Sequence, residues 1–103
     1  MTPRLHGVEI PREHLARFCR EHGIRKLSLF GSILTDKFRS DSDVDLLVEF
    51  EKGRVPGFLG LARLEIDLTA MIGRKVDLRT PHELSRYFRS DVVNSAVVQY
   101  ERS

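Results

Sequence analysis

Cysteine and long hydrophobic runs are almost absent from this chain of 103 residues. Cys19 is the single cysteine, which excludes an intramolecular disulfide and a cysteine-based zinc site. Its position on an apolar helix face predicts a buried structural thiol. No apolar run approaches the roughly 20 residues that a membrane span needs, and the N-terminus lacks the apolar core of a signal peptide. We therefore expect a cytoplasmic protein.

The chain also lacks a strong excess of charge, internal repeats, low-complexity segments and a domain linker. Its formal net charge of +2 permits a polyanionic partner without indicating one. With 41% hydrophobic and 31% charged residues, the composition is that of an ordinary soluble globular protein. We expect one domain over residues 1–103, with residues 1–9 as a loose lead-in. The histidines show no ligand spacing, which predicts structural or surface roles for His6, His14, His22 and His82.

Helical periodicity is found in three parts of the chain. Apolar residues recur at helical spacing after Pro11 and over residues 58–72, and each of these stretches is followed by a glycine that is a natural helix stop. The third part opens with a capping box at residues 80–83 and continues as a helix from Ser90. Its first turns should make apolar contacts through Leu84, Tyr87 and Phe88, and the stretch from Ser90 uses Val93, Ala96, Val97 and Tyr100. Of these we expect Val93, Val97 and Tyr100 in the core, with a partner-binding role as the alternative.

Alternating apolar and polar residues predict three strands, over residues 25–30, 43–50 and 75–79, with a short helical turn after Ser32. One face of the second strand is uniformly apolar and should pack on helices, so the acids of the other face should point away from the main core. The order of helices and strands predicts an α/β or α+β fold around a small sheet.

Acidic residues stand at the start of the second strand and in the third. Asp43 and Asp45 are two residues apart, so they project from the same face of a strand. Carboxylates held so close repel each other, and Mg²⁺, which prefers oxygen ligands, is a partner that makes the arrangement favourable. Asp77 supplies a third acid. At the end of the first strand, Gly31 allows close backbone approach and Ser32 offers a hydroxyl to phosphate. Together these features indicate metal-dependent nucleotidyl transfer.

This spacing resembles the DNA polymerase β-like nucleotidyltransferases, specifically their minimal members. The family signature is Gly-Ser, ten residues, Asp-x-Asp, and a third acid on a later strand; the matching positions are Gly31-Ser32, residues 33–42, Asp43-Val44-Asp45 and Asp77. The resemblance covers nearly the whole chain and implies a small mixed β-sheet with helices packed on one face. The chain departs from many members at Asp36, which stands where they carry glycine.

The resemblance also implies a two-metal mechanism. In such a mechanism, Asp43 and Asp45 would hold the Mg²⁺ that binds the triphosphate of ATP, and a second Mg²⁺ would be shared with Asp77. Asp77 also stands where a base could deprotonate the attacking hydroxyl. Ser32 and the amides after Gly31 would hold the β- and γ-phosphates. Arg39 and Lys37 are further candidates for neutralising phosphate charge.

Minimal members of this kind are similar to antitoxins that act on a HEPN ribonuclease toxin. The resemblance therefore implies a hetero-oligomer in which AMP is transferred from ATP to a tyrosine of the toxin. Two alternatives stay open: neutralisation of the partner by binding alone, and transfer to RNA or to a small hydroxyl compound. The small charge and the small size do not favour a nucleic-acid partner, and the sequence does not identify the acceptor or the base.

Overall fold

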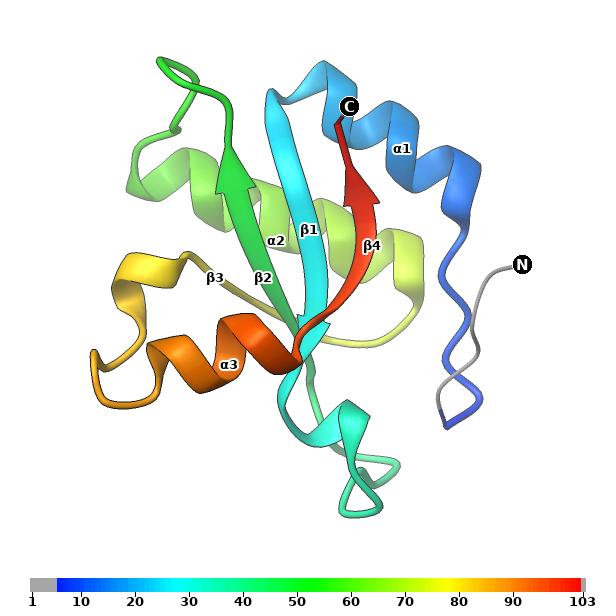
Figure 1. The fold of residues 1–103 in the computed structure, drawn as a ribbon. Helices are drawn as coiled ribbons and strands as arrows, with labels where there is room; N and C mark the ends of the chain where they lie inside the picture. Colours follow the sequence, from blue (N-terminus) through cyan, green and yellow to red (C-terminus); the bar gives the residue numbers. More distant parts are fainter. Residues whose placement is uncertain (1–5, 103) are drawn as a thin grey trace.

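The computed structural model describes residues 6–102, and within them the chain forms a four-stranded sheet with helices on both sides (Figure 1). In chain order the elements are α1 (Arg12–Glu21), β1 (Ile24–Phe30), the 3₁₀ helix η1 (Gly31–Leu34), β2 (Val44–Phe50), α2 (Phe58–Ile72), β3 (Val76–Arg79), the 3₁₀ helix η2 (Pro81–Glu83), α3 (Arg89–Ser95) and β4 (Val97–Glu101). No helix of this part of the chain is long and apolar enough to cross a membrane.

The strands lie in the order β3-β2-β1-β4, so β1 and β2 are central and β3 and β4 form the edges. β1 runs antiparallel to both of its neighbours, whereas β2 and β3 are parallel. A parallel pair needs a crossover connection, and α2 provides it. This mixed topology brings the end of β1 and the starts of β2 and β3 to one end of the sheet.

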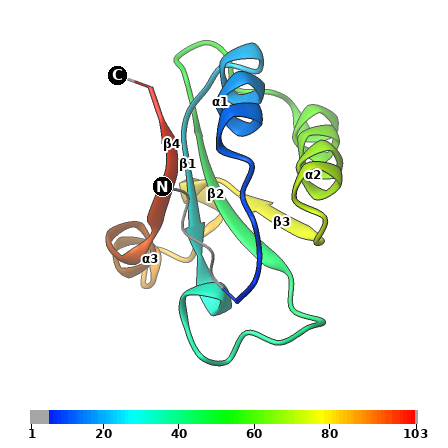
Figure 2. The same cartoon turned by 90° about the vertical axis from the view of Figure 1, so that its right-hand side faces the viewer.

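The main core lies between one face of the sheet and the helices α1 and α2 (Figure 2). α3 lies on the opposite side of the sheet. The predicted acids stand on that opposite face, because they alternate with the buried residues of β2 and β3. The core is built from Val8, Ile10, Leu15, Phe18, Cys19, Ile24, Leu27, Leu29, Ile33, Val44, Leu46, Val48, Leu64, Leu68, Val76 and Leu78.

Most predicted elements are confirmed. The helix expected over residues 58–72 matches α2, and Gly73 ends it in the left-handed conformation with φ of 80°. The short turn after Ser32 is η1, and the three predicted strands are β1, β2 and β3 to within one residue at either end. Cys19 is buried in α1 as expected, and burial raises the pKa of its thiol to about 12.

The predicted C-terminal helix is wrong in its second half. α3 ends at Ser95, and the chain then forms strand β4, which pairs with the open edge of β1. Val93 and Val97, expected in the core, are 38% and 39% exposed. The capping box at residues 80–83 does form. It starts only the short 3₁₀ helix η2, which ends at Glu83.

One further expectation is wrong, and another is only partly covered by the described residues. Tyr87 and Phe88 were expected to make apolar contacts, and their side chains are 77% and 64% exposed. The loose lead-in expected over residues 1–9 falls partly outside the described residues. Within them, Val8 is buried in the core.

Candidate active site

Gly31 lies where β1 ends, directly beside the carboxylate of Asp45. Phe30 pairs with Asp45 across the β1–β2 ladder, so the following residue passes close to this carboxylate. Gly31 has φ of +80°, and a Cβ atom built on it would lie 2.2 Å from Oδ2 of Asp45. Glycine is therefore the residue that leaves room for both the turn and the acid.

Asp45 and Asp77 are register partners on the parallel strands β2 and β3. Both are half-buried. Burial, followed by the charges of Asp77 and Asp43, raises the pKa of Asp45 from 3.8 to about 6, and the charge of Arg79 offsets part of this rise. Asp77 and Asp43 therefore each lie close enough to Asp45 to repel its carboxylate.

Asp43 lies at the end of the loop between η1 and β2, and Arg74 holds this loop in place. Nη2 of Arg74 donates to the backbone oxygens of Ser42 at 2.7 Å and of Arg39 at 3.1 Å. Its guanidinium also lies 4.8 Å from the centroid of the Phe38 ring, which is a cation–π contact. Because Arg74 stands between α2 and β3, the loop that carries Asp43 is tied to the strand that carries the third acid.

Two side chains of α2 hold the edge strand β3. The backbone N–H of Val76 donates to Oγ1 of Thr69 at 3.0 Å, and that of Leu78 donates to Oε2 of Glu65 at 2.8 Å. Residues four apart share a helix face, so α2 presents both acceptors to the same strand. Asp77 lies between the two anchored amides, and its position is thus fixed on both sides.

Arg79 holds the carboxylate of Asp77. Its Nε donates to Oδ1 at 3.0 Å and its Nη2 donates to Oδ2 at 3.3 Å, so both oxygens of Asp77 are engaged. The hydrogen bond to Asp77 is the main cause that raises the pKa of Arg79. On its other side, Nη1 of Arg79 lies 3.9 Å from Oε2 of Glu83 in η2.

The donor chemistry of the three acids suits a hard divalent cation. Mg²⁺ prefers carboxylate oxygens. Burial is the main cause that raises the pKa of Asp45, and the repulsion by Asp77 and Asp43 that adds to it would be relieved by such an ion. Within residues 6–102, no group of three or more His, Cys, Asp or Glu side chains is already arranged as a metal site. The three acids therefore fit Mg²⁺ by the chemistry of their oxygens. Both oxygens of Asp77, however, are hydrogen-bonded to Arg79.

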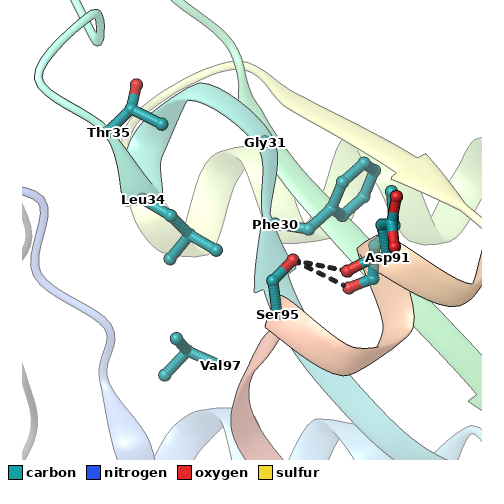
Figure 3. Close-up of a pocket in the computed structure, with 8 residues that line it drawn as sticks. Phe30, Gly31, Leu34, Thr35, Asp91, Ser95 and Val97 are labelled. Carbon is teal, nitrogen blue, oxygen red and sulfur yellow. Dashed lines mark hydrogen bonds between the residues drawn. The ribbon is translucent and has the colours of Figure 1, made fainter. Parts of the chain in front are cut away.

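An apolar recess of about 870 Å³ opens beside Gly31 (Figure 3). The end of β1 and η1 form one wall, and α3 with the start of β4 forms the other. Oγ of Ser95 donates to the backbone oxygen of Asp91 at 2.7 Å, so this hydroxyl is already satisfied. Most of the remaining wall is hydrocarbon, because the lining residues are Phe30, Gly31, Leu34, Thr35, Asp91, Val92, Ser95 and Val97.

The family model for the nucleotidyltransferase domain matches residues 11–99. The chain belongs to this family. Protein adenylyltransferase MntA of Thermococcus cleftensis is 33% identical to it over 84 residues, which are 82% of this chain and 83% of that protein. The predicted enzyme class, nucleotidyltransferase, is confirmed.

Solved structures confirm the fold of this nucleotidyltransferase. A minimal nucleotidyltransferase, so named provisionally, superposes with a TM-score of 0.68 at 37% identity, covering 84% of this chain and 86% of that chain. A complex of a tri-AMPylated Shewanella oneidensis HEPN toxin with an MNT antitoxin matches with a TM-score of 0.62 at 18% identity, covering 88% and 70% of the two chains. At that identity the second likeness concerns the fold alone.

The other predicted site residues of this nucleotidyltransferase lie in or after η1. The backbone oxygen of Ser32 accepts hydrogen bonds from the N–H of Thr35 at 2.9 Å and from its Oγ1 at 2.8 Å. Arg39 and Lys37 are exposed in the loop that leads to Asp43. Their contacts with phosphate remain predictions.

Sequence reasoning missed several residues that shape the site: Glu65, Thr69, Arg74, Arg79 and Val92. Arg79 was detectable, because it stands two residues after Asp77 and shares its strand face. The others act across elements that only the folded chain brings together. They carry no local signal of their own.

Proposed function

We propose that this chain is an Mg²⁺-dependent protein adenylyltransferase that transfers AMP from ATP to a tyrosine of a HEPN-type toxin and thereby acts as its antitoxin. The register pairing of Asp45 with Asp77, beside the glycine at position 31, is the observation that carries the proposal. The names of the related adenylyltransferase and of the toxin complex support the choice of AMP and of a protein acceptor.

Asp43, Asp45 and Asp77 would hold the magnesium ions, which when bound supply positive charge to the phosphate oxygens. Gly31 lets the backbone of η1 approach the β- and γ-phosphates, and the hydroxyl of Ser32 would donate to them. Arg39 would offset phosphate charge from the exposed loop.

In the transfer itself, the acceptor hydroxyl oxygen forms a bond to the α-phosphorus. The bond between the α-phosphorus and its bridging oxygen to the β-phosphate breaks, and pyrophosphate leaves with that electron pair. A carboxylate oxygen of Asp77 would take the proton of the hydroxyl. The site thus needs Asp77 as an anion that faces the acceptor.

The recess beside Gly31 suits the nucleoside part of ATP. A nucleotide with its phosphates at Gly31 and Ser32 would have its nucleoside at the mouth of this recess, because Gly31 is one of the lining residues. The ring of Phe30 and the aliphatic side chains of Leu34 and Val92 offer apolar surface to a planar base. The carboxylate of Asp91 is the acidic group among the lining residues and would accept from an amino group of the base.

The test is transfer of label from α-labelled ATP to a purified HEPN-type toxin in the presence of Mg²⁺. Asp43→Asn and Asp45→Asn should each abolish labelling, because each removes a proposed metal ligand. Asp41→Asn is the matched control, since this exposed residue lies two positions earlier in the same loop. Replacement of the acceptor tyrosine of the toxin by Phe should abolish labelling as well.

Three outcomes would count against this function. Label that appears on tRNA or an aminoglycoside, and never on protein, would change the acceptor class. Equal labelling by wild type and Asp45→Asn would remove the proposed metal site. Full suppression of toxicity by an Asp43→Asn/Asp77→Asn variant would favour neutralisation by binding alone.

A further inference from the structure

Arg79 and Asp77 form a two-point ion pair inside the candidate site. The guanidinium contacts both carboxylate oxygens, at 3.0 Å and 3.3 Å. It is also held from behind by Glu83, whose Oε2 lies 3.9 Å from Nη1. Oε1 of Glu83 accepts in turn from the N–H and the hydroxyl of Thr80, at 3.1 Å and 3.2 Å. The capping box of η2 thus places a second carboxylate near the guanidinium of Arg79.

This ion pair engages the third acid of the candidate metal site. Asp77 is the register partner of Asp45, and its charge acts on that residue. Yet the described residues hold no group of three ligating side chains arranged for a metal. Both oxygens that Asp77 would offer to a cation are hydrogen-bonded to Arg79, and the guanidinium already supplies positive charge to that carboxylate.

We propose that Arg79 is a positioning residue that holds Asp77 until a divalent cation displaces it. The proposal rests on the metal role given to the three acids above. In this arrangement the site has two states. In one, Arg79 neutralises and orients Asp77; in the other, Asp77 turns toward Asp45 and Asp43, and Arg79 is released.

The exposure of the pair makes this exchange reversible. The side chains of Arg79 and Asp77 are 47% and 33% exposed. Ion pairs with that much contact with water contribute little to stability, so separating the two side chains costs little free energy. A divalent ion bound by several carboxylates can meet that cost, whereas a monovalent ion cannot bridge them in the same way.

The test measures binding of Mn²⁺ alone, without nucleotide, to the full chain by the electron paramagnetic resonance signal of free Mn²⁺. Arg79→Ala removes the competing cation and should tighten Mn²⁺ binding roughly three- to tenfold. Arg79→Lys keeps the positive charge but cannot make the two-point contact with both oxygens of Asp77. Its Mn²⁺ affinity should lie between those of wild type and Arg79→Ala.

The matched control is Arg102→Ala. Arg102 also forms an ion pair, with Glu51, and its removal changes the net charge by the same amount. It lies beside Arg25, near the start of β1, whereas the acids lie at the other end of that strand. Its substitution should leave Mn²⁺ affinity within about twofold of wild type.

A double-mutant cycle separates competition for Asp77 from a general effect of charge. In an Asp77→Asn background, Arg79→Ala should change Mn²⁺ affinity by less than about twofold, because no carboxylate is left to compete for. The proposal is overturned if Arg79→Ala leaves the affinity unchanged or weakens it, or if its effect persists in full with Asn at position 77.

The same titration distinguishes failure of this proposal from failure of the proposed function. Asp43→Asn and Asp45→Asn must weaken Mn²⁺ binding if the three acids are the metal site. If they do not, the site assignment fails and Arg79 has no ion to compete with. If they do while Arg79→Ala has no effect, the proposed function stands and only the role of Arg79 is overturned.

Discussion

Gly31 and Asp45 approach each other so closely that no methyl group fits between them. A Cβ atom on residue 31 would lie 2.2 Å from Oδ2 of Asp45 and 3.1 Å from its Cγ. The positive φ of +80° adds backbone strain for any other residue. The glycine of the Gly-Ser pair is thus needed for the position of the acid as well as for approach to phosphate.

Gly31→Ala should lower the rate of adenylyl transfer roughly a hundredfold, because the methyl group displaces the Asp45 carboxylate by about 1 Å. The matched control is Gly53→Ala, since Gly53 has nearly the same φ, +79°, but a Cβ atom built on it would meet nothing within 4 Å. Both variants should lose about 1 kcal/mol of unfolding free energy, measured in urea, through backbone strain, and Gly31→Ala should lose more because its methyl group also displaces Asp45. Equal activity of the two variants would contradict the role of Gly31.

The raised pKa of Asp45 predicts a pH-dependent stability in the absence of metal. The ordinary pKa of this carboxyl group is 3.8. In the folded chain, burial and repulsion by Asp77 and Asp43 raise it to about 6. Between those values the folded state binds more protons than the unfolded state, so the free energy of unfolding falls as the pH rises. The destabilisation caused by ionised Asp45 is absent at a pH below 3.8 and complete at a pH above about 6.

Asp45→Asn should therefore be more stable than wild type at about pH 7 in a chelating buffer. Allowing for solvent screening at this half-buried position, the gain is on the order of 1 kcal/mol. Urea unfolding should show the gain shrinking toward zero as the pH falls to about 4. Asp41→Asn should show no such pH-dependent gap, and a constant difference for Asp45→Asn would contradict the coupling of the three acids.

The sequence was sufficient for the parts of the fold whose pattern is local. Residues 58–72 combine a broad apolar stripe with a terminal glycine, and α2 has those bounds. Residues 97–101 were misread because Val93, Ala96, Val97 and Tyr100 have helical spacing. Their strand depends on an open edge of β1 that only the assembled sheet supplies.

The candidate site divides in the same way. Asp43, Asp45 and Asp77 could be predicted because strand alternation and the spacing of a known motif both mark them. The recess could not, because half of its wall comes from α3 and β4, where the prediction of one continuous helix failed. Contacts between distant elements, such as Glu65 with the N–H of Leu78, leave no pattern in a single sequence.

The contact between α2 and the edge strand predicts a measurable loss of stability. Glu65→Ala leaves the N–H of Leu78 without its carboxylate acceptor and should lower the free energy of unfolding by about 1–2 kcal/mol. Glu65→Gln keeps an acceptor oxygen and should lose less. Arg63→Ala, which breaks only the exposed pair with Asp67 at 3.7 Å, is the control and should cost less than about 0.5 kcal/mol in the same urea titrations. Equal losses for Ala at positions 65 and 63 would show that the edge contact does not stabilise β3.

The recess beside Gly31 predicts that binding of the nucleoside can be separated from binding of the phosphates. Val92→Phe places a ring in the recess and should weaken ATP binding roughly tenfold, because overfilling an apolar site costs about 1–3 kcal/mol. Binding of inorganic tripolyphosphate should stay within about twofold, since it needs only the phosphate contacts. Val93→Phe makes the same change one position later on α3, at a residue that does not line the recess, and should affect neither ligand. Calorimetric titrations with Mg²⁺ present, on variants whose circular dichroism matches wild type, decide the matter. Loss of tripolyphosphate binding along with ATP binding would place the effect of Val92→Phe on the phosphates, and unchanged ATP binding would leave the recess without a role in holding the nucleoside.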